Sequence, residues 1–114
     1  MEPNTLSEAV TPPNPLRGLA QNALRRIVDT ERSGVETVRT HAVFDHDADH
    51  YLLVAEGWQG YRRVYRTLAH VALIGDCLHI YEDGTVEGVA AHLYAAGVAP
   101  ESIVCEWTTL PPPA

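Results

Sequence analysis

β-branched, aromatic and leucine residues dominate three neighbouring stretches in the middle of the chain, residues 51–57, 61–73 and 77–82. Such stretches, bounded by turn residues, are typical of β-strands. Residues 57–60 and 74–76 separate them, and glycine there can supply the positive φ that a tight reversal needs. The pattern predicts a three-stranded β-meander against which the other elements pack.

Two further stretches have the spacing of amphipathic helices. The first begins at Pro15, with an Asx cap before it, and we expect Gly34 to end it. The second has Thr85 as its N-cap, Glu87 in its first turn and Gly97 just after its end. The expected buried stripes are Leu16, Leu19, Ala23, Leu24, Ile27 and Val28 in the first helix, and Val86, Val89, Ala90 and Leu93 in the second.

Alternation also predicts a strand over residues 35–44, before the meander, and a last strand over residues 103–107. The element order is then α-β-β-β-β-α-β. This segregation predicts an α+β fold, with an antiparallel or mixed five-stranded sheet and two packed helices. We place a single domain at 14–109, between a flexible N-terminal tail at 1–13 and a proline-rich C-terminal tail at 110–114.

Composition limits the function classes. The 114 residues, 46% of them hydrophobic, suit one domain with a modest core. The formal net charge of −7 argues against direct DNA binding by the chain alone. Charge is bipolar, because residues 62–66 carry three arginines whereas residues 76–106 hold six acids and no base. DNA binding would need the following arginines on one continuous surface: Arg25, Arg26, Arg39, Arg62, Arg63 and Arg66.

Residues 1–15 lack an apolar targeting core, and no apolar run approaches the roughly 18 residues of a membrane span. Without a secretory signal, Cys77 and Cys105 are expected to be reduced thiols. We therefore expect a cytoplasmic protein with no membrane association. His79 is the one base adjacent to Cys77 in sequence, but two small residues buried in a sheet explain the cysteines better than a nucleophile does.

The most metal-like cluster is His46, Asp47, Asp49 and His50, which combines two ligand types. The stretch has the pattern of a hairpin turn, where aspartate supplies turn chemistry. We therefore interpret it as a solvated turn and assign no metal site. We also predict no cofactor, since the chain has no glycine-rich phosphate loop.

The strongest functional signal is a group of aromatic and arginine residues around the first turn of the meander: Trp58, Arg62, Arg63 and Tyr65. Exposed tryptophan, tyrosine and arginine are the residue types that dominate binding energy at interfaces. We predict that these four residues bind a partner. The alternative is a turn tryptophan that caps the sheet, with arginines paired to Glu56 or Asp49 on neighbouring strands.

Several short phrases stand in a fixed order along the chain: Phe44-Asp45, His50-Tyr51, Gly57-Trp58, Arg62-Arg63-Val64-Tyr65, His70-Val71, Leu78-His79-Ile80, Asp83-Gly84-Thr85, Gly88-Val89-Ala90, Leu93, Ala96-Gly97-Val98 and Ile103-Val104. In this order and spacing they resemble the XisI family, the fdxN element excision controlling factor proteins. The resemblance runs from Leu16 to Trp107. It departs from the family pattern where Val86 separates Thr85 from Glu87, and where residues 108–113 replace the usual arginine- and threonine-bearing segment.

The resemblance implies a non-catalytic accessory protein in programmed DNA element excision, working beside a site-specific recombinase and a nuclease-fold partner, XisH. We therefore expect no enzyme activity. The alternative, from another class, is a small hydrolase or metal-dependent enzyme that uses His70 and His79 with a nearby carboxylate. It requires these three groups in one cleft. The sequence does not decide between a monomer and a homo-oligomer.

Overall fold

The computed structural model describes residues 14–31, 34 and 36–106. The elements in chain order are helix α2 (Pro15–Thr30), strands β1 (Val38–Asp45), β2 (His50–Gln59), β3 (Arg62–Ile74) and β4 (Cys77–Asp83), helix α3 (Val89–Ala96), the 3-10 turn η1 (Pro100–Ser102) and strand β5 (Ile103–Cys105). This confirms the α+β fold and the order α-β-β-β-β-α-β. The predicted tails at 1–13 and 110–114, and Trp107 of the predicted last strand, lie outside the described residues.

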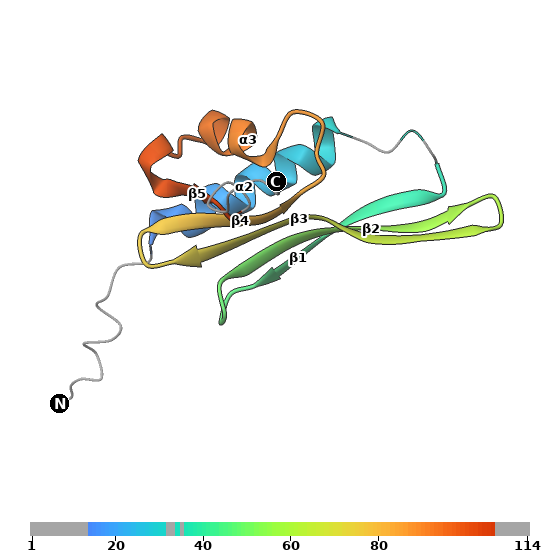
Figure 1. Cartoon of the computed structure of the whole chain (residues 1–114), viewed down its shortest axis with the longest axis horizontal. Coiled ribbons are helices and arrows are strands. Elements are labelled where there is room, and N and C mark those ends of the chain that lie inside the picture. Colours follow the sequence, from blue (N-terminus) through green and yellow to red (C-terminus); the bar gives the residue numbers. More distant parts are fainter. Residues whose placement is uncertain (1–13, 32–33, 35, 107–114) are drawn as a thin grey trace, which may run out of the picture.

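The five strands form one sheet in the order β1-β2-β3-β4-β5. Strands β1 to β4 pair antiparallel with one another, whereas β5 runs parallel to β4 because α3 carries the chain back between them. Both helices lie on the same face of this mixed sheet (Figure 1). We call the other side the open face.

The core lies between the helices and the sheet. Four residues of α2 are completely buried, Ala20, Ala23, Leu24 and Ile27, and they pack against Tyr51, Leu53, Val71, Leu78 and Ile80 of the sheet and against Val89 and Leu93 of α3. Alternate residues of a strand face opposite sides. The neighbours of Tyr51 and Leu53 along β2 are therefore on the open face, where they are half-buried.

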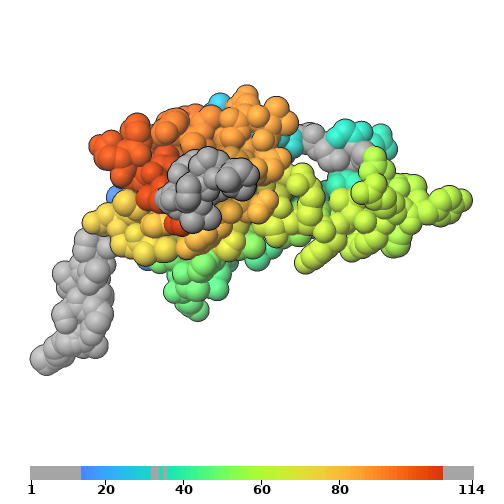
Figure 2. Space-filling model, in the orientation of Figure 1, coloured from blue at the N-terminus to red at the C-terminus, as the bar shows by residue number. Residues whose placement is uncertain are grey.

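The β2–β3 hairpin extends beyond the helical layer. β3 pairs with β4 only from Ala69 onward, so residues 56–67, which we call the arm, project from the body (Figures 1 and 2). β1 accompanies the arm as far as the pair Val38↔Gly57. A Cβ atom on Gly57 would lie 1.9 Å from the carbonyl oxygen of Thr37, so the close approach of β1 at this point requires glycine.

Several predicted boundaries in the first half of the chain were wrong. α2 ends at Thr30 rather than near Gly34, and β1 begins at Val38 rather than at residue 35. The first reversal of the meander takes two residues, Gly60 and Tyr61, because the ladder continues to the pair Gln59↔Arg62. A positive φ of 65° at Gly60 allows this short turn.

The start of the second helix was also predicted wrongly. α3 begins at Val89 after Gly88, and Val86 is 91% exposed instead of buried. The reason is Asp83, whose carboxylate accepts hydrogen bonds from the N–H of Val89 at 2.7 Å and of Thr85 at 3.0 Å. Asp83 thus caps the helix from the end of β4, and Thr85 lies in the connecting loop. The predicted C-terminal glycine is confirmed, since Gly97 is left-handed with φ 108°. Among the described residues, no helix combines the length and apolarity needed to cross a bilayer.

Candidate functional site

Three of the four predicted partner-binding residues lie together on the open face of the arm. Trp58 is directly opposite Arg63 in the ladder, and Tyr65 lies two residues further along β3. Trp58 is 52% exposed and Tyr65 71% exposed. The Arg63 guanidinium lies over the indole, 5.5 Å from its centroid, which is cation–π geometry. The structure therefore presents two accessible rings with a cation held between the strands.

Glu56 fixes this patch from the neighbouring position on β2. Its carboxylate accepts hydrogen bonds from Arg63 at 3.1 Å and contacts His41 Nε2 at 2.9 Å. The interactions with His41 and then Arg63 lower the pKa of Glu56. Arg63 is thus paired as the alternative interpretation expected, while the rings beside it stay accessible.

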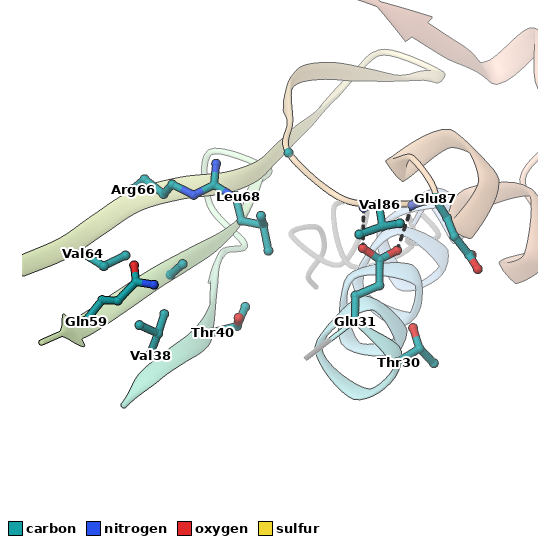
Figure 3. A pocket seen from close by; sticks show the side chains of 12 residues that line it. Thr30, Glu31, Val38, Thr40, Gln59, Val64, Arg66, Leu68, Val86 and Glu87 are labelled. Atoms are coloured by element: carbon teal, nitrogen blue, oxygen red, sulfur yellow. Dashed lines mark hydrogen bonds between the residues drawn. The ribbon is translucent and has the colours of Figure 1, made fainter. Parts of the chain in front are cut away.

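Arg62, the fourth predicted residue, is not part of this patch. Because strand side chains alternate, Arg62 lies on the other face of β3 with Val64 and Arg66. Val64 and Arg66 line a groove of about 540 Å³ between the arm and the helical layer (Figure 3). Its other lining residues come from α2, the sheet and the β4–α3 loop: Thr30, Glu31, Val38, Thr40, Ala55, Gln59, Leu68, Gly84, Val86 and Glu87.

Both walls of the groove carry charged and apolar side chains. Figure 3 shows Arg66 and Gln59 on the arm, with Glu31 and Glu87 on the opposite wall. Its volume falls within the range of about 300–1,000 Å³ that is typical of small-molecule pockets in proteins. Sequence reasoning missed this groove because its walls come from five separate segments of the chain, between Thr30 and Glu87.

Glu31 holds the far wall of the groove in place. Its carboxylate accepts hydrogen bonds from the N–H groups of Val86 at 2.6 Å and Glu87 at 3.2 Å, and from His92 Nε2 at 2.7 Å. Burial alone raises the pKa of Glu31, but these hydrogen bonds outweigh burial and the pKa ends below its usual value. The end of α2 is thereby clamped to the β4–α3 loop.

Glu31, Glu87 and His92 also bring three potential metal-ligand atoms within 4.8 Å of one another. Their hydrogen bonds favour a clamp over a metal centre, because both carboxylate oxygens of Glu31 already bind N–H groups. A metal on His92 Nε2 would place the proton on Nδ1, which is buried and has no partner among the described residues. Metal-binding histidines nearly always donate that second proton to an acceptor.

The two histidines of the enzyme alternative have different partners on the open face. His70 Nε2 lies 2.8 Å from His50 Nδ1, whereas His79 Nδ1 lies 2.5 Å from Glu106 Oε2. Burial, and then the nearby His50, lower the pKa of His70 and favour its neutral form. Both histidines contact the ring of Tyr81, at 5.1 and 6.5 Å between centroids. A carboxylate therefore reaches His79, while His70 is engaged by another imidazole.

The metal-like stretch from His46 to His50 forms a hairpin turn. Asp45 Oδ1 accepts hydrogen bonds from the N–H groups of Asp47 and Ala48, which forms an Asx turn. Asp49 accepts from Arg17 at 2.7 and 3.0 Å and from the hydroxyl of Tyr51 at 2.6 Å. The bond from Arg17 lowers the pKa of Asp49 to about 2. Asp49 is thus bound by Arg17 and Tyr51, and His46 and His50 contact different residues, Gln21 and His70.

The arginines required for direct DNA binding are spread over different surfaces. Arg25 lies on α2 over the ring of Phe44, 5.0 Å from its centroid, on the helical side of the sheet. Arg63 is on the open face of the arm, and Arg62 and Arg66 are on its groove side. The six arginines therefore do not form one continuous face.

Comparisons with known proteins agree with this fold. The family model described as XisI protein matches residues 14–110. The chain is similar to the structure of the fdxN element excision controlling factor XisI from Anabaena variabilis ATCC 29413, with 25% identity and a TM-score of 0.62 over 77% of this chain and 85% of that chain. A XisI-like protein from the same organism, with 22% identity and a TM-score of 0.63 over 78% of this chain and 80% of that chain, shares the fold. No curated protein matches the chain.

Proposed function

The chain belongs to the XisI family, and from this membership we propose that it is a non-catalytic controlling factor of DNA element excision that docks on a protein partner through its arm. The observation that carries the docking is the open face of the arm, where Trp58 and Tyr65 are exposed beside a fixed arginine. Rings and arginines of this kind dominate binding energy in interfaces. Because Arg63 is held by Glu56, this side chain loses little freedom on binding.

The partner we propose is a XisH-like nuclease-fold protein, which would act together with a site-specific recombinase. The similarity to a structure named as an excision controlling factor supports the role in excision, and the partner is the one that the family resemblance implies. The chain's negative total charge of −7 also favours a protein partner over a duplex. In this division of labour the present chain positions or restrains its partner, and the partner performs the chemistry on DNA.

The docking can be tested by co-expressing the chain with a XisH-like protein and measuring the affinity at low salt. We expect a complex, and we expect Trp58→Ala to weaken it by about 10- to 30-fold, as truncation of a hot-spot ring does. Tyr94→Ala is the matched control, because Tyr94 is a similarly exposed ring, 49% accessible, on α3. We expect the control to change affinity by less than about 2-fold.

Excision itself provides the second readout. In cells that carry an excisable element and lack their own copy of this chain, the wild-type chain should restore excision control and Trp58→Ala should not. Absence of a complex at low salt, or equal affinities for Trp58→Ala and Tyr94→Ala, would overturn the proposal. Circular dichroism of both variants separates a docking defect from a folding defect.

A further inference from the structure

One edge of the sheet is left open along the arm. β4 pairs with β3 only from the pair Ala69↔Asp83, and the N–H of Gly84 then bonds the carbonyl of Leu68 as the chain turns away toward α3. Within the described residues, no strand pairs with residues 62–67 on that side. Residues 62–67 of β3 therefore form an exposed strand edge, whereas from Ala69 onward β3 is covered on this side by β4.

The register shows which backbone groups the edge presents. In an antiparallel ladder, successive residues direct their N–H and C=O groups alternately to one side and the other. The two-residue turn closes on the pair Gln59↔Arg62, so residues 62, 64 and 66 face β2. The N–H and C=O groups of Arg63 and Tyr65 consequently point away from β2, toward the open edge.

The groove lies beside the same edge. Val64 and Leu68 of β3 form one apolar wall, and Val86 of the β4–α3 loop, 91% exposed, forms another. A strand placed against Arg63 and Tyr65 would direct alternate side chains into this groove and onto the open face. Peptide-binding domains use this arrangement, in which backbone bonds supply affinity and pockets for alternate side chains supply specificity.

The positive charge of the arm indicates which kind of strand binds at this edge. Residues 62–66 carry three arginines, and Arg62 and Arg66 have no carboxylate partner in the described part of the chain. A second copy of this edge would bring three more arginines against them, which is unfavourable. An acidic segment would instead pair with the free guanidinium groups.

We propose that the arm binds an extended, acidic segment of its partner protein as an added strand on the edge of β3 between Arg62 and Thr67. This inference deepens the proposed function and rests on it, since it names the kind of partner segment that the arm takes. Main-chain pairing occurs at Arg63 and Tyr65, acidic side chains of the segment reach Arg62 and Arg66, and an apolar side chain enters the groove.

The probe is a peptide selected from a display library of random nine-residue sequences on the full-length chain. Because Arg62, Val64 and Arg66 share the groove side of β3, we expect the selected peptides to carry an apolar residue with acidic residues two positions before and after it. Hydrogen exchange of the free chain should be fast at the amides of Arg63 and Tyr65 and slow at those of Val64 and Arg66. Adding the peptide should slow the two edge amides by about 10-fold or more. The amides of Thr40 and Ala42, which face the outer edge of β1, are the control and should not change.

Two substitutions at one position isolate the backbone contribution. Tyr65→Ala and Tyr65→Pro both remove the ring, but only proline removes the outward N–H, and proline is tolerated at a strand edge. We expect Tyr65→Pro to bind the peptide about 10-fold more weakly than Tyr65→Ala. Arg66→Glu should also weaken peptide binding, and the loss of affinity should be larger at low salt than at high salt.

Three results would overturn the inference: selected peptides without acidic residues, unchanged exchange at Arg63 and Tyr65, or edge protection that appears without peptide as the protein concentration rises. The last would identify a second copy as the occupant. Failure here is distinct from failure of the docking proposal. If Trp58→Ala still disrupts the complex with the XisH-like protein while the edge amides stay unprotected, docking uses side chains alone and the proposed function stands.

Discussion

Removing the Glu31 carboxylate should destabilise the protein and release the wall of the groove. Glu31→Ala deletes three hydrogen bonds, from His92 Nε2 and from the N–H groups of Val86 and Glu87. His92 is 2% exposed, so its orphaned N–H costs about 1–3 kcal/mol. The two backbone donors belong to exposed residues and can turn to water, so each contributes about 0.5 kcal/mol. We expect a total loss of about 3 kcal/mol.

Urea unfolding followed by circular dichroism measures this loss. With a slope of about 1.5 kcal/mol per molar urea, the midpoint of Glu31→Ala should fall by about 2 M relative to the wild type. Glu87→Ala is the matched control, because that carboxylate is 66% exposed and 3.6 Å from His92. We expect the control to lose about 0.5 kcal/mol or less.

The pH dependence of the same comparison tests the electrostatic part. The folded-state pKa of Glu31 is below its usual value, so its stabilising contribution is complete above the unfolded-state pKa and is lost as pH falls through the folded-state pKa. The stability difference between the wild type and Glu31→Gln should therefore be constant near neutral pH and shrink below about pH 4. Equal losses in Glu31→Ala and Glu87→Ala, or a difference that grows toward acid, would refute the clamp.

Two further perturbations probe the turn and the base of the arm. Asp49→Asn keeps a residue type that tolerates the left-handed backbone at this position, φ 57°, and removes the charge that Arg17 stabilises. Because the pKa of Asp49 is about 2, we expect the variant to lose about 1–2 kcal/mol of stability at pH 7. In thermal unfolding at different pH values, the wild type should lose this contribution between about pH 4 and pH 2, and the variant should show no such loss. Gly57→Ala should lower the free energy of unfolding in urea by about 2 kcal/mol or more, since the new Cβ meets the carbonyl of Thr37. The control, Gly18→Ala on the exposed side of α2, should stabilise the protein by about 0.5–1 kcal/mol. A loss of stability in both variants, or in neither, would contradict the close approach at Gly57.

Local patterns were enough to predict the order of elements and the family. The strand at residues 51–57 and the glycine at the end of α3 depend on residues close together in sequence, and both were predicted correctly. The start of α3 was missed because two capping residues compete there. Asp83 reaches the N–H of Val89, the first residue of α3, from the end of β4, whereas the Thr85 hydroxyl accepts from the N–H of Gly88, before the helix begins. A propensity scale contains no term for such a contact.

The groove and the clamp could not be predicted because they depend on contacts between distant segments. Glu31 bonds to backbone N–H groups 55 and 56 positions later, and His92 lies 61 positions away. In contrast, strand alternation already implied that the side chains of Arg62 and Arg63 lie on opposite faces of β3. The sequence pattern grouped them by adjacency, although adjacent strand residues point to opposite faces. Applying the period of two to the predicted site would have separated the ring patch from the groove.

The structure also separates residues that build the fold from residues free to bind. Gly57 is required by the approach of β1, and Asp83 is required to cap α3. Trp58 and Tyr65 have no comparable internal role, since half or more of each residue is exposed and Arg63, which lies over the Trp58 ring, is itself held by Glu56. Full burial of a large apolar side chain contributes about 1.5–3 kcal/mol, and these rings forgo the part that corresponds to their exposed surface. A partner that covers them recovers this free energy, and for that reason we assign binding to the arm and folding to the body.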